Sequence, residues 1–502
     1  MRRKNIYKSA IAGLLEEGIA VICGFILPRM ILSYFGSDYN GIIASVTQFI
    51  GCIALLKSGI GMATKAALYE PLYNNDNKRI SEIMAATTKF LRKVAFIFVL
   101  GIIIFACVYP MFVKESFDWG FTASLVLIIS LGTFFQYYFG LSNQLLLEAD
   151  QKYYIVSIIT IVNIVFNTII SVICMKLGMS IHGMKLCSSV VYCSTPIALN
   201  YYVYKKYNLD KKVEPDWMSI SKRWDAFGMQ LANFINDNTD IIVATLFLNM
   251  KEVSVYTIYY LVINGIKKII FRISKGVESA LGNLKAEKNE IKLREIFKDF
   301  EFVLNGICTF VFSCLITLIV PFVGVYTKGV TDVNYTRYVF AFVACCAELF
   351  YCLRLAYTFM VQAVGAFSET KKYFYIEAMI NIISSVILVK FMGLVGIVVG
   401  TLIAMIYRTY IFAYYVYNEI LKISFTGFYK SIVITIGGVF TNGIIGMFIM
   451  SRVDVNNYLQ WFGVALLVAL VDLIITILIY YICNAEFFKK TLKLLVGRIK
   501  NE

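Results

Sequence analysis

The sequence predicts an all-α polytopic membrane protein with about fourteen transmembrane helices. Of its 502 residues 59% are hydrophobic and 16% are charged, a balance that ordinary soluble proteins do not have. The hydrophobic residues form long uninterrupted stretches, and the basic residues of the loops between them alternate between many and few. We expect two pseudo-repeated six-helix bundles around a central cavity, followed by two additional C-terminal helices.

Fourteen apolar segments are each long enough to cross a bilayer, which takes about 20 residues of helix. Little sequence is left for a soluble domain, so the function is expected to lie within the membrane. The first segment is too long to be a cleaved signal peptide and lacks an A-x-A site. The segments are 10–33, 41–64, 94–114, 119–147, 153–176, 181–204, 225–248, 253–275, 301–326, 336–362, 374–392, 394–417, 431–451 and 459–483.

The net charge of +15 follows the membrane topology. The two ends of the chain and every second loop hold 32 of the 47 basic residues. Cytoplasmic loops are the ones enriched in Lys and Arg, so both termini are predicted to be cytoplasmic and the number of spans even. Attraction to anionic lipid adds to this bias, and nucleic-acid binding is not expected. The intervening loops hold only Lys114, Lys176, Lys251, Lys328, Arg337, Lys390 and Arg452.

Two pairs of similar short segments indicate an internal duplication. The turn at 35–41 has the same length and a similar pattern as the turn at 248–254, and QKYY at 151–154 resembles KKYF at 371–374. Repeats of this kind are common in secondary transporters, which rock one bundle against the other. The predicted organisation is an N-terminal bundle at 1–204, a cytoplasmic linker at 205–224, a C-terminal bundle at 225–417, and two further helices with a basic tail at 418–502.

The sequence lacks the common short motifs of nucleotide-binding proteins, zinc proteases and serine hydrolases. It has no Walker A, HExxH or GxSxG motif, so no direct use of ATP and no enzyme activity is expected. The twelve cysteines are scattered without CxxC spacing and are interpreted as small buried hydrophobic residues, with no metal site. The one histidine, His182, is interpreted as a polar residue at the membrane interface rather than a proton switch or a base.

Charged residues inside the first two segments are candidates for function, because a charge at membrane depth costs about 2.5–3.5 kcal/mol on insertion scales. Glu17 and Lys57 are about equally far from the turn between segments one and two, so we predict that they pair, in a structural or a functional role. Glu16 is a second candidate for pairing or ion coupling. Pro28 would give the first helix a hinge. Arg29 beside it would either serve a gate for an anionic substrate or reach the outer headgroups.

In the second half, segments seven and eight are the most polar pair. Asp237 and Asp240 lie in the run NFINDNTDII, and Lys267, Lys268 and Arg272 lie in the next segment. Counted from the turn between the segments, Asp237 and Lys267 fall within about one turn in depth. We favour the lining of a cavity over a packed structural network for these groups.

Later segments add Glu348 and Arg354, six residues apart and so on different faces of one helix, and Arg408. Asp472 lies near the middle of the last segment, where either ion coupling or a hydrogen bond within a helix pair would explain it. The proposed cationic set suits an anionic lipid phosphate or pyrophosphate, which Arg and Lys bind well. The cationic set is Arg29, Lys57, Lys267, Lys268, Arg272 and Arg354. The set for ion coupling or charge pairing is Glu16, Glu17, Asp237, Asp240, Glu348 and Asp472.

The layout resembles a known family. The segments 27–41 (LPRMILSYFGSDYNG), 147–154 (LEADQKYY) and 238–248 (NTDIIVATLFL) are similar to the polysaccharide-transporter branch of the multidrug/oligosaccharidyl-lipid/polysaccharide (MOP) exporter superfamily. This branch includes the O-antigen and capsule repeat-unit flippases. The resemblance covers nearly the whole chain, and its motifs are degenerate, so they indicate the superfamily better than the substrate.

The resemblance implies a flippase of the bacterial cytoplasmic membrane that moves an undecaprenyl-pyrophosphate-linked oligosaccharide to the outer leaflet by alternating access. It implies two bundles in a V, a coupling proton or sodium ion and no other cofactor. The positions matching the family's pyrophosphate-binding cations are Arg29, Lys57 and Arg272. The last two helices would form a lipid-facing groove. The expected partners are the lipid-linked oligosaccharide, membrane lipids and other polysaccharide-assembly membrane proteins, and the chain is expected to be a monomer.

Three alternatives stay open. A peptidoglycan-precursor flippase ranks lower, because such proteins usually carry more arginines in the first span than Arg29. A cation-coupled multidrug antiporter would be expected to have an acidic cavity. A membrane-embedded glycan polymerase or acyltransferase would be expected to have a sizeable external loop or a His/Asp site, and the predicted external loops are short.

Overall fold

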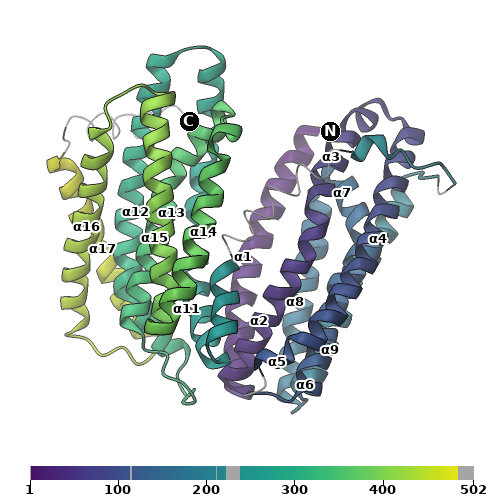
Figure 1. Ribbon diagram of the computed structural model, residues 1–502, viewed down its shortest axis with the longest axis horizontal. Coiled ribbons are helices and arrows are strands. Elements are labelled where there is room, and N and C mark those ends of the chain that lie inside the picture. Colours follow the sequence, from purple (N-terminus) through teal and green to yellow (C-terminus); the bar gives the residue numbers. More distant parts are fainter. Residues whose placement is uncertain (1, 114–115, 211, 222–237, 484, 486–502) are drawn as a thin grey trace. The chain divides into compact units, whose positions relative to one another are not determined.

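The computed structural model describes residues 2–113, 116–210, 212–221, 238–483 and 485, and within these ranges the chain is helical with no strand (Figure 1). The helices form two compact units, which divide between Thr257 and Ile258, inside one long helix. The predicted domain bounds at 204, 224 and 417 are not decided by this division and stay predictions.

The first unit contains the helices up to α9 and the start of α11, with its main packing between α1 and α8, between α8 and α9, and between α6 and α9. Short irregular turns interrupt two of its helices. The elements are α1 (Arg2–Phe35), α2 (Ser37–Ile53), η1 (Ala54–Lys57), α3 (Ser58–Asn74), α4 (Asn77–Val108), α5 (Pro110–Val113), α6 (Trp119–Phe135), η2 (Gln136–Gly140), α7 (Leu141–Ala149), α8 (Tyr153–Lys176), α9 (Ile181–Lys206) and η3 (Met218–Ile220).

The second unit begins within α11 and contains the remaining helices. Its α15 packs against α13 and α14, and its α12 packs against α13, α16 and α17. The elements are α11 (Met250–Ala286), α12 (Glu290–Tyr326), α13 (Tyr338–Val364), α14 (Phe367–Met392), α15 (Leu394–Tyr415), η4 (Val416–Ile420), α16 (Thr426–Met450) and α17 (Tyr458–Cys483).

Eleven helical stretches in the described part of the chain are long and apolar enough to cross a membrane. They correspond to eleven of the fourteen predicted segments. Of the other three, 41–64 is split into α2, η1 and α3, 181–204 is the less apolar helix α9, and 225–248 is described only from residue 238, where a short apolar helix runs over Asn238–Phe247. The all-helical membrane fold is therefore confirmed, and the count of fourteen spans stays a prediction.

Some of the helices begin or end at residues that satisfy terminal backbone groups. Asp76 accepts a hydrogen bond from the Arg79 backbone N–H at 3.0 Å, and Asn289 accepts one from Lys292 at 3.1 Å. These side chains bind donors that the first turn of a helix leaves unpaired. Gly365 ends α13 at a φ of 75°, a left-handed conformation that glycine adopts without strain.

The two turns that the sequence compares meet inside the first unit. Asn40 donates its side-chain amide to the Ser254 hydroxyl at 2.8 Å, and Lys251 lies 3.8 Å from the Asp38 carboxylate. Gly41 is so close to the Met250 backbone that a Cβ there would lie 1.9 Å from the Met250 carbonyl oxygen. A side chain at position 41 would therefore separate the two turns.

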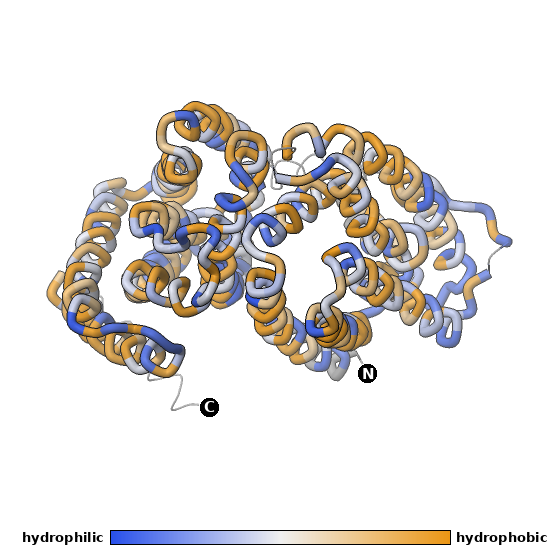
Figure 2. Tube along the Cα trace, turned by 90° about the horizontal axis from the view of Figure 1, so that it is seen from below, coloured by the Kyte–Doolittle hydropathy of each residue, from blue (hydrophilic) through white to orange (hydrophobic). Residues whose placement is uncertain are grey.

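The surface pattern agrees with a lipid environment. Figure 2 shows hydrophobic residues along most of the helices of each unit, with hydrophilic residues frequent in the loops and at helix ends. Large apolar side chains such as Ile97, Phe166 and Leu470 are more than half exposed. Exposed apolar surface on this scale is typical of helices that face lipid rather than water.

Candidate functional site

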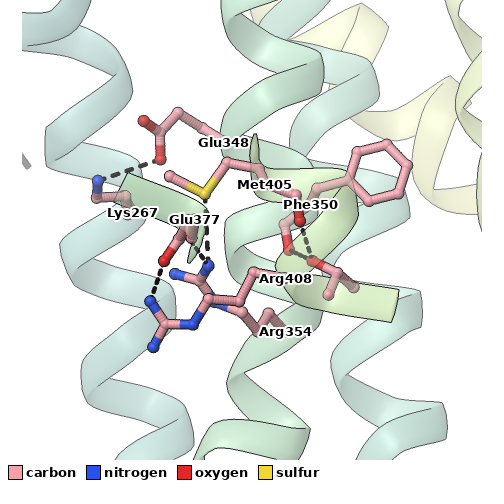
Figure 3. A network of polar contacts seen from close by, with 8 residues as sticks. Lys267, Glu348, Phe350, Arg354, Glu377, Met405 and Arg408 are labelled. Atoms are coloured by element: carbon pink, nitrogen blue, oxygen red, sulfur yellow. Dashed lines mark hydrogen bonds and ion pairs between the residues drawn. The ribbon is translucent and has the colours of Figure 1, made fainter. Parts of the chain in front are cut away.

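A pair of opposite charges joins α11 to α13 in the second unit (Figure 3). The Lys267 ammonium lies 3.1 Å from a Glu348 carboxylate oxygen. The Glu348 side chain is 4% exposed and the Lys267 side chain 19% exposed. The Lys267 nitrogen also lies 4.3 Å from the centre of the Tyr351 ring, a cation–π contact. Glu348 and Tyr351 are three residues apart, so they share one face of α13.

A second buried carboxylate, Glu377 on α14, binds two arginines. Arg354 of α13 donates to one of its oxygens at 2.6 Å, and Arg408 of α15 donates to the other (Figure 3). The Arg408 guanidinium also lies against the rings of Phe374 and Phe412. Arg408 is fourteen residues from the start of α15 and seven residues from its end, about 21 Å and about 10 Å along the helix, so it lies within the helix and not at either end.

The charges of this network do not cancel. Lys267 and Glu348 neutralise each other, whereas two arginines share the one carboxylate of Glu377. These five side chains, with three cations and two carboxylates, therefore carry one net positive charge. The arginine fork and the carboxylate match in shape, which favours their pairing where water is scarce.

Two more predicted cations lie on α11 next to this network. Lys268 and Arg272 are both exposed and one helical turn apart. The neighbouring Ile269 and Ile273 are 60% and 62% exposed. This face of α11 therefore combines two positive charges with apolar side chains, a combination that suits a ligand with an anionic head and an apolar tail.

The predicted residues of the first helix lie in an uninterrupted α1. The helix continues through Pro28, and Glu17 and Arg29 are half-buried. The Tyr153 hydroxyl of α8 donates to Glu16 at 3.3 Å. The hinge at Pro28 stays a prediction. The predicted pair of Glu17 with Lys57 also stays a prediction, because the Lys57 side chain lies outside the described part of the structure.

In segment seven, Asp237 lies outside the described residues. Asp240 is 6% exposed and accepts a hydrogen bond from the Tyr256 hydroxyl at 3.2 Å. Both residues belong to the first unit. The hydrogen-bond partner of Asp240 in this contact is thus a neutral hydroxyl on α11.

Asp472 is fully buried on α17. It accepts a hydrogen bond from the Cys314 thiol of α12 at 3.3 Å. The structure therefore supplies a contact between two helices, which was one of the two explanations left open by the sequence. Ion coupling by Asp472 is not tested by this contact.

Two buried carboxylates were missed by the sequence reasoning. Glu377 holds the arginine triad, and Glu301 of α12 accepts hydrogen bonds from the hydroxyls of Tyr357 at 2.5 Å and Tyr417 at 2.7 Å. Both lie in predicted apolar segments, 374–392 and 301–326. A carboxylate inside such a segment was the sequence signal that could have identified them. Arg408 was noted from the sequence, but its partner was not.

The remaining candidates have ordinary surroundings in the described part of the chain. The His182 ring nitrogen lies 2.9 Å from the Ser124 hydroxyl and 3.1 Å from the Phe121 carbonyl oxygen. The described cysteines are free thiols. No group of three His, Cys, Asp or Glu residues in the described ranges could hold a metal ion.

No protein-family model and no curated protein matches the sequence. Solved structures, in contrast, match over most of the chain. A structure described as the lipid II flippase MurJ in an inward closed conformation is 15% identical, with a TM-score of 0.67 over 96% of this chain and 99% of that chain. An inward-facing multidrug resistance MATE family transporter of the MOP superfamily is 13% identical, with a TM-score of 0.65 over 80% of this chain and 96% of that chain.

A MOP superfamily transporter from Pyrococcus furiosus, described as having a binding pocket of reverse polarity, is 14% identical with a TM-score of 0.53 over 84% of this chain and 97% of that chain. Identities this low establish the fold alone. Together with the eleven apolar helices, these likenesses establish that the chain is a multi-pass membrane protein with the fold of MOP-type transporters and flippases.

Proposed function

We propose that this protein is a flippase of the bacterial cytoplasmic membrane for an undecaprenyl-pyrophosphate-linked oligosaccharide. In this proposal the lipid moves from the inner to the outer leaflet by ion-coupled alternating access, for the synthesis of a cell-surface polysaccharide. The cationic face of α11, with Lys268 and Arg272, binds the pyrophosphate.

The observation that carries the proposal is the excess of positive charge on the helices of the second unit. The cations are Lys267, Lys268, Arg272, Arg354 and Arg408. Lys267 pairs with Glu348, and Arg354 and Arg408 share the carboxylate of Glu377. A site for cationic drugs would need the opposite sign. A pyrophosphate offers several oxygens that accept charge-assisted hydrogen bonds from Arg and Lys.

The extent of the structural likeness supports a lipid-linked substrate over a drug. The flippase structure covers 96% of this chain, whereas the inward-facing MATE transporter covers 80% and leaves about a fifth without a counterpart. The predicted extra segment at 418–502, which includes α16 and α17, is of similar size. Two extra helices beyond a twelve-helix transporter suit a substrate whose long lipid tail needs additional apolar surface.

The first experiment measures flipping in proteoliposomes that contain a fluorescent undecaprenyl-pyrophosphate oligosaccharide. Loss of a charge-assisted hydrogen bond costs about 1.5–3 kcal/mol, so we expect Arg272→Ala to slow flipping about 10- to 100-fold at limiting substrate. The matched control is Lys285→Ala, which removes a cation at the end of the same helix and should leave flipping unchanged. Arg29→Ala tests whether the first unit contributes.

Two results would overturn the proposal. A wild-type protein that moves no lipid-linked oligosaccharide but exports a cationic dye is an antiporter. A purified protein that produces polymerised glycan is an enzyme. Equal flipping by the wild type and Arg272→Ala would keep the substrate and remove Arg272 from the site.

A further inference from the structure

The last helix, α17, contacts the rest of the second unit through a stripe of residues four apart. Its buried positions are Val464, Val468, Asp472, Thr476 and Tyr480. Residues at this spacing lie on one face of a helix. This face packs against α12 and α16. Asp472 is thus at the centre of the surface that attaches α17 to the protein.

On this surface, apolar contacts lie on one side of Asp472 and hydrogen bonds between hydroxyls lie on the other. Val464 and Val468 pack with Leu318 in an apolar cluster. On the other side, the Tyr480 hydroxyl lies 3.0 Å from the Thr309 hydroxyl and 3.1 Å from that of Thr435.

The amide of Asn442 adds a polar contact from α16, donating to the Thr476 hydroxyl at 2.9 Å. Close packing supports these contacts, since a Cβ at Gly446 would lie 2.3 Å from the Thr317 hydroxyl oxygen. Contacts of small residues and hydroxyls are how helices associate in lipid.

The Asp472 carboxylate has few hydrogen-bond donors around it. Its side chain is fully buried, a thiol binds one oxygen, and the other oxygen has no hydrogen-bond partner in the described part of the protein. From residue 303 to the end of α12, from residue 431 to the end of α16, and throughout α17, the sequence has no Lys, Arg or His, and Asp472 is the only Asp or Glu. The other titratable groups on these faces are Cys308, Cys314 and Tyr480.

The other buried carboxylates of this unit differ in this respect. Glu377 binds two arginines, Glu348 binds Lys267, and Glu301 accepts from two tyrosine hydroxyls. An ionised carboxylate at position 472 would have lost its hydration and gained only a weak thiol donor. A proton removes this charge and supplies a donor of its own.

We propose that Asp472 is a proton-binding site, and that its proton is exchanged when α17 separates from α12. A bound metal cation would need several oxygen ligands, whereas the partner that the structure shows for Asp472 is the Cys314 thiol, and no group of three His, Cys, Asp or Glu residues in the described ranges could hold a metal ion. Because Asp472 is fully buried, its proton reaches water only after the helices part. Proton exchange and movement of α17 are therefore one event, and in a flippase this event would couple the proton gradient to transport. The coupling rests on the proposed function, whereas the proton site does not.

Infrared spectroscopy of the full-length protein in lipid vesicles at neutral pH tests the site directly. We expect a carboxylic-acid C=O band in the wild type that Asp472→Asn lacks. The matched control is Asp454→Asn, the same substitution at an exposed residue before α17, which should leave the band in place. If Asp472→Asn loses no band, or if sodium chloride at constant pH removes it, the proton site is overturned, and the second result identifies a sodium site.

A second variant keeps the test valid if Asp472→Asn does not fold. Cys314→Ser replaces the thiol with a stronger hydroxyl donor to the same oxygen, so the acid band should shift but persist. A spectrum that Cys314→Ser leaves unchanged would contradict the assignment.

The coupling is tested in proteoliposomes with a pH gradient and no sodium gradient. We expect the gradient to accelerate flipping by the wild type and to have no effect on Asp472→Asn. Acceleration of both proteins would overturn the coupling while leaving the infrared result valid. If the wild type flips no lipid, the proposed function fails, and the infrared bands still decide whether Asp472 holds a proton.

Discussion

The carboxylate of Glu377 illustrates at the scale of one residue how this protein keeps charges inside a membrane. Each of its oxygens binds one arginine, from α13 and from α15, and the side chain is 2% exposed. A buried ion pair contributes little net stability compared with apolar residues, but removal of one partner leaves an uncompensated charge. Glu377 is therefore expected to be indispensable as long as both arginines are present.

We predict that Glu377→Gln lowers the free energy of unfolding by about 3–5 kcal/mol, because the buried Arg354 and Arg408 both lose the carboxylate to which they donate. The measurement is the unfolding midpoint of the purified protein in detergent. Glu369→Gln, an exposed position on the same helix, is the control and should change nothing.

The triple replacement of Arg354, Glu377 and Arg408 by methionine should restore stability, since no unpaired charge remains. Its flipping activity then separates a structural from a functional role. A Glu377→Gln protein as stable as the wild type would show that the arginines have another counter-ion.

At the scale of the element, two irregular turns in the first unit support each other. The helix that contains residues 41–64 is broken by the tighter turn η1, and η2 is a wider π-turn between α6 and α7. The Tyr137 hydroxyl of η2 donates to the Ala54 carbonyl oxygen of η1 at 2.7 Å. Backbone groups freed inside a membrane need such partners, because lipid offers none. Turns of this kind often lie at hinges or functional sites, and the predicted site residue Lys57 is the last residue of η1.

We predict that Tyr137→Phe destabilises the protein by about 1–2 kcal/mol, because the Ala54 carbonyl loses its donor. Thermal unfolding in detergent measures the effect. Tyr138→Phe, at the adjacent position in the same turn, is the matched control and should be neutral. If both variants unfold at the wild-type temperature, water satisfies the Ala54 carbonyl and the hydrogen bond is dispensable.

At the scale of the whole molecule, the positions of the basic residues determine how the chain lies across the membrane. The long helices and the loop charges predict that both termini are cytoplasmic. A green fluorescent protein fused to the C-terminus should therefore be fluorescent, and a periplasmic alkaline phosphatase fused there should be inactive. A dark fluorescent-protein fusion and an active phosphatase fusion would contradict this prediction and would place the C-terminus on the outer side of the membrane.

Much of the fold could be predicted from the sequence. Helix positions follow from the lengths of the apolar stretches, and the bounds of α8, for example, are those of the predicted segment 153–176. The segment 41–64 was predicted as one continuous helix, whereas the structure breaks it at η1. The hydrogen-bond partner of this break, Tyr137, is 83 residues away from Ala54 in the sequence.

The candidate site could be predicted only as a list of residues. The sequence by itself determined that this is a multi-pass helical membrane protein with excess positive charge, because length and hydrophobicity are properties of each segment alone. Only the tertiary structure decided which charges meet. Arg354 and Arg408 reach Glu377 across 23 and 31 residues, and Cys314 reaches Asp472 across 158. Such pairings depend on the rotation of each helix about its axis and on its neighbours, and no local sequence pattern encodes either.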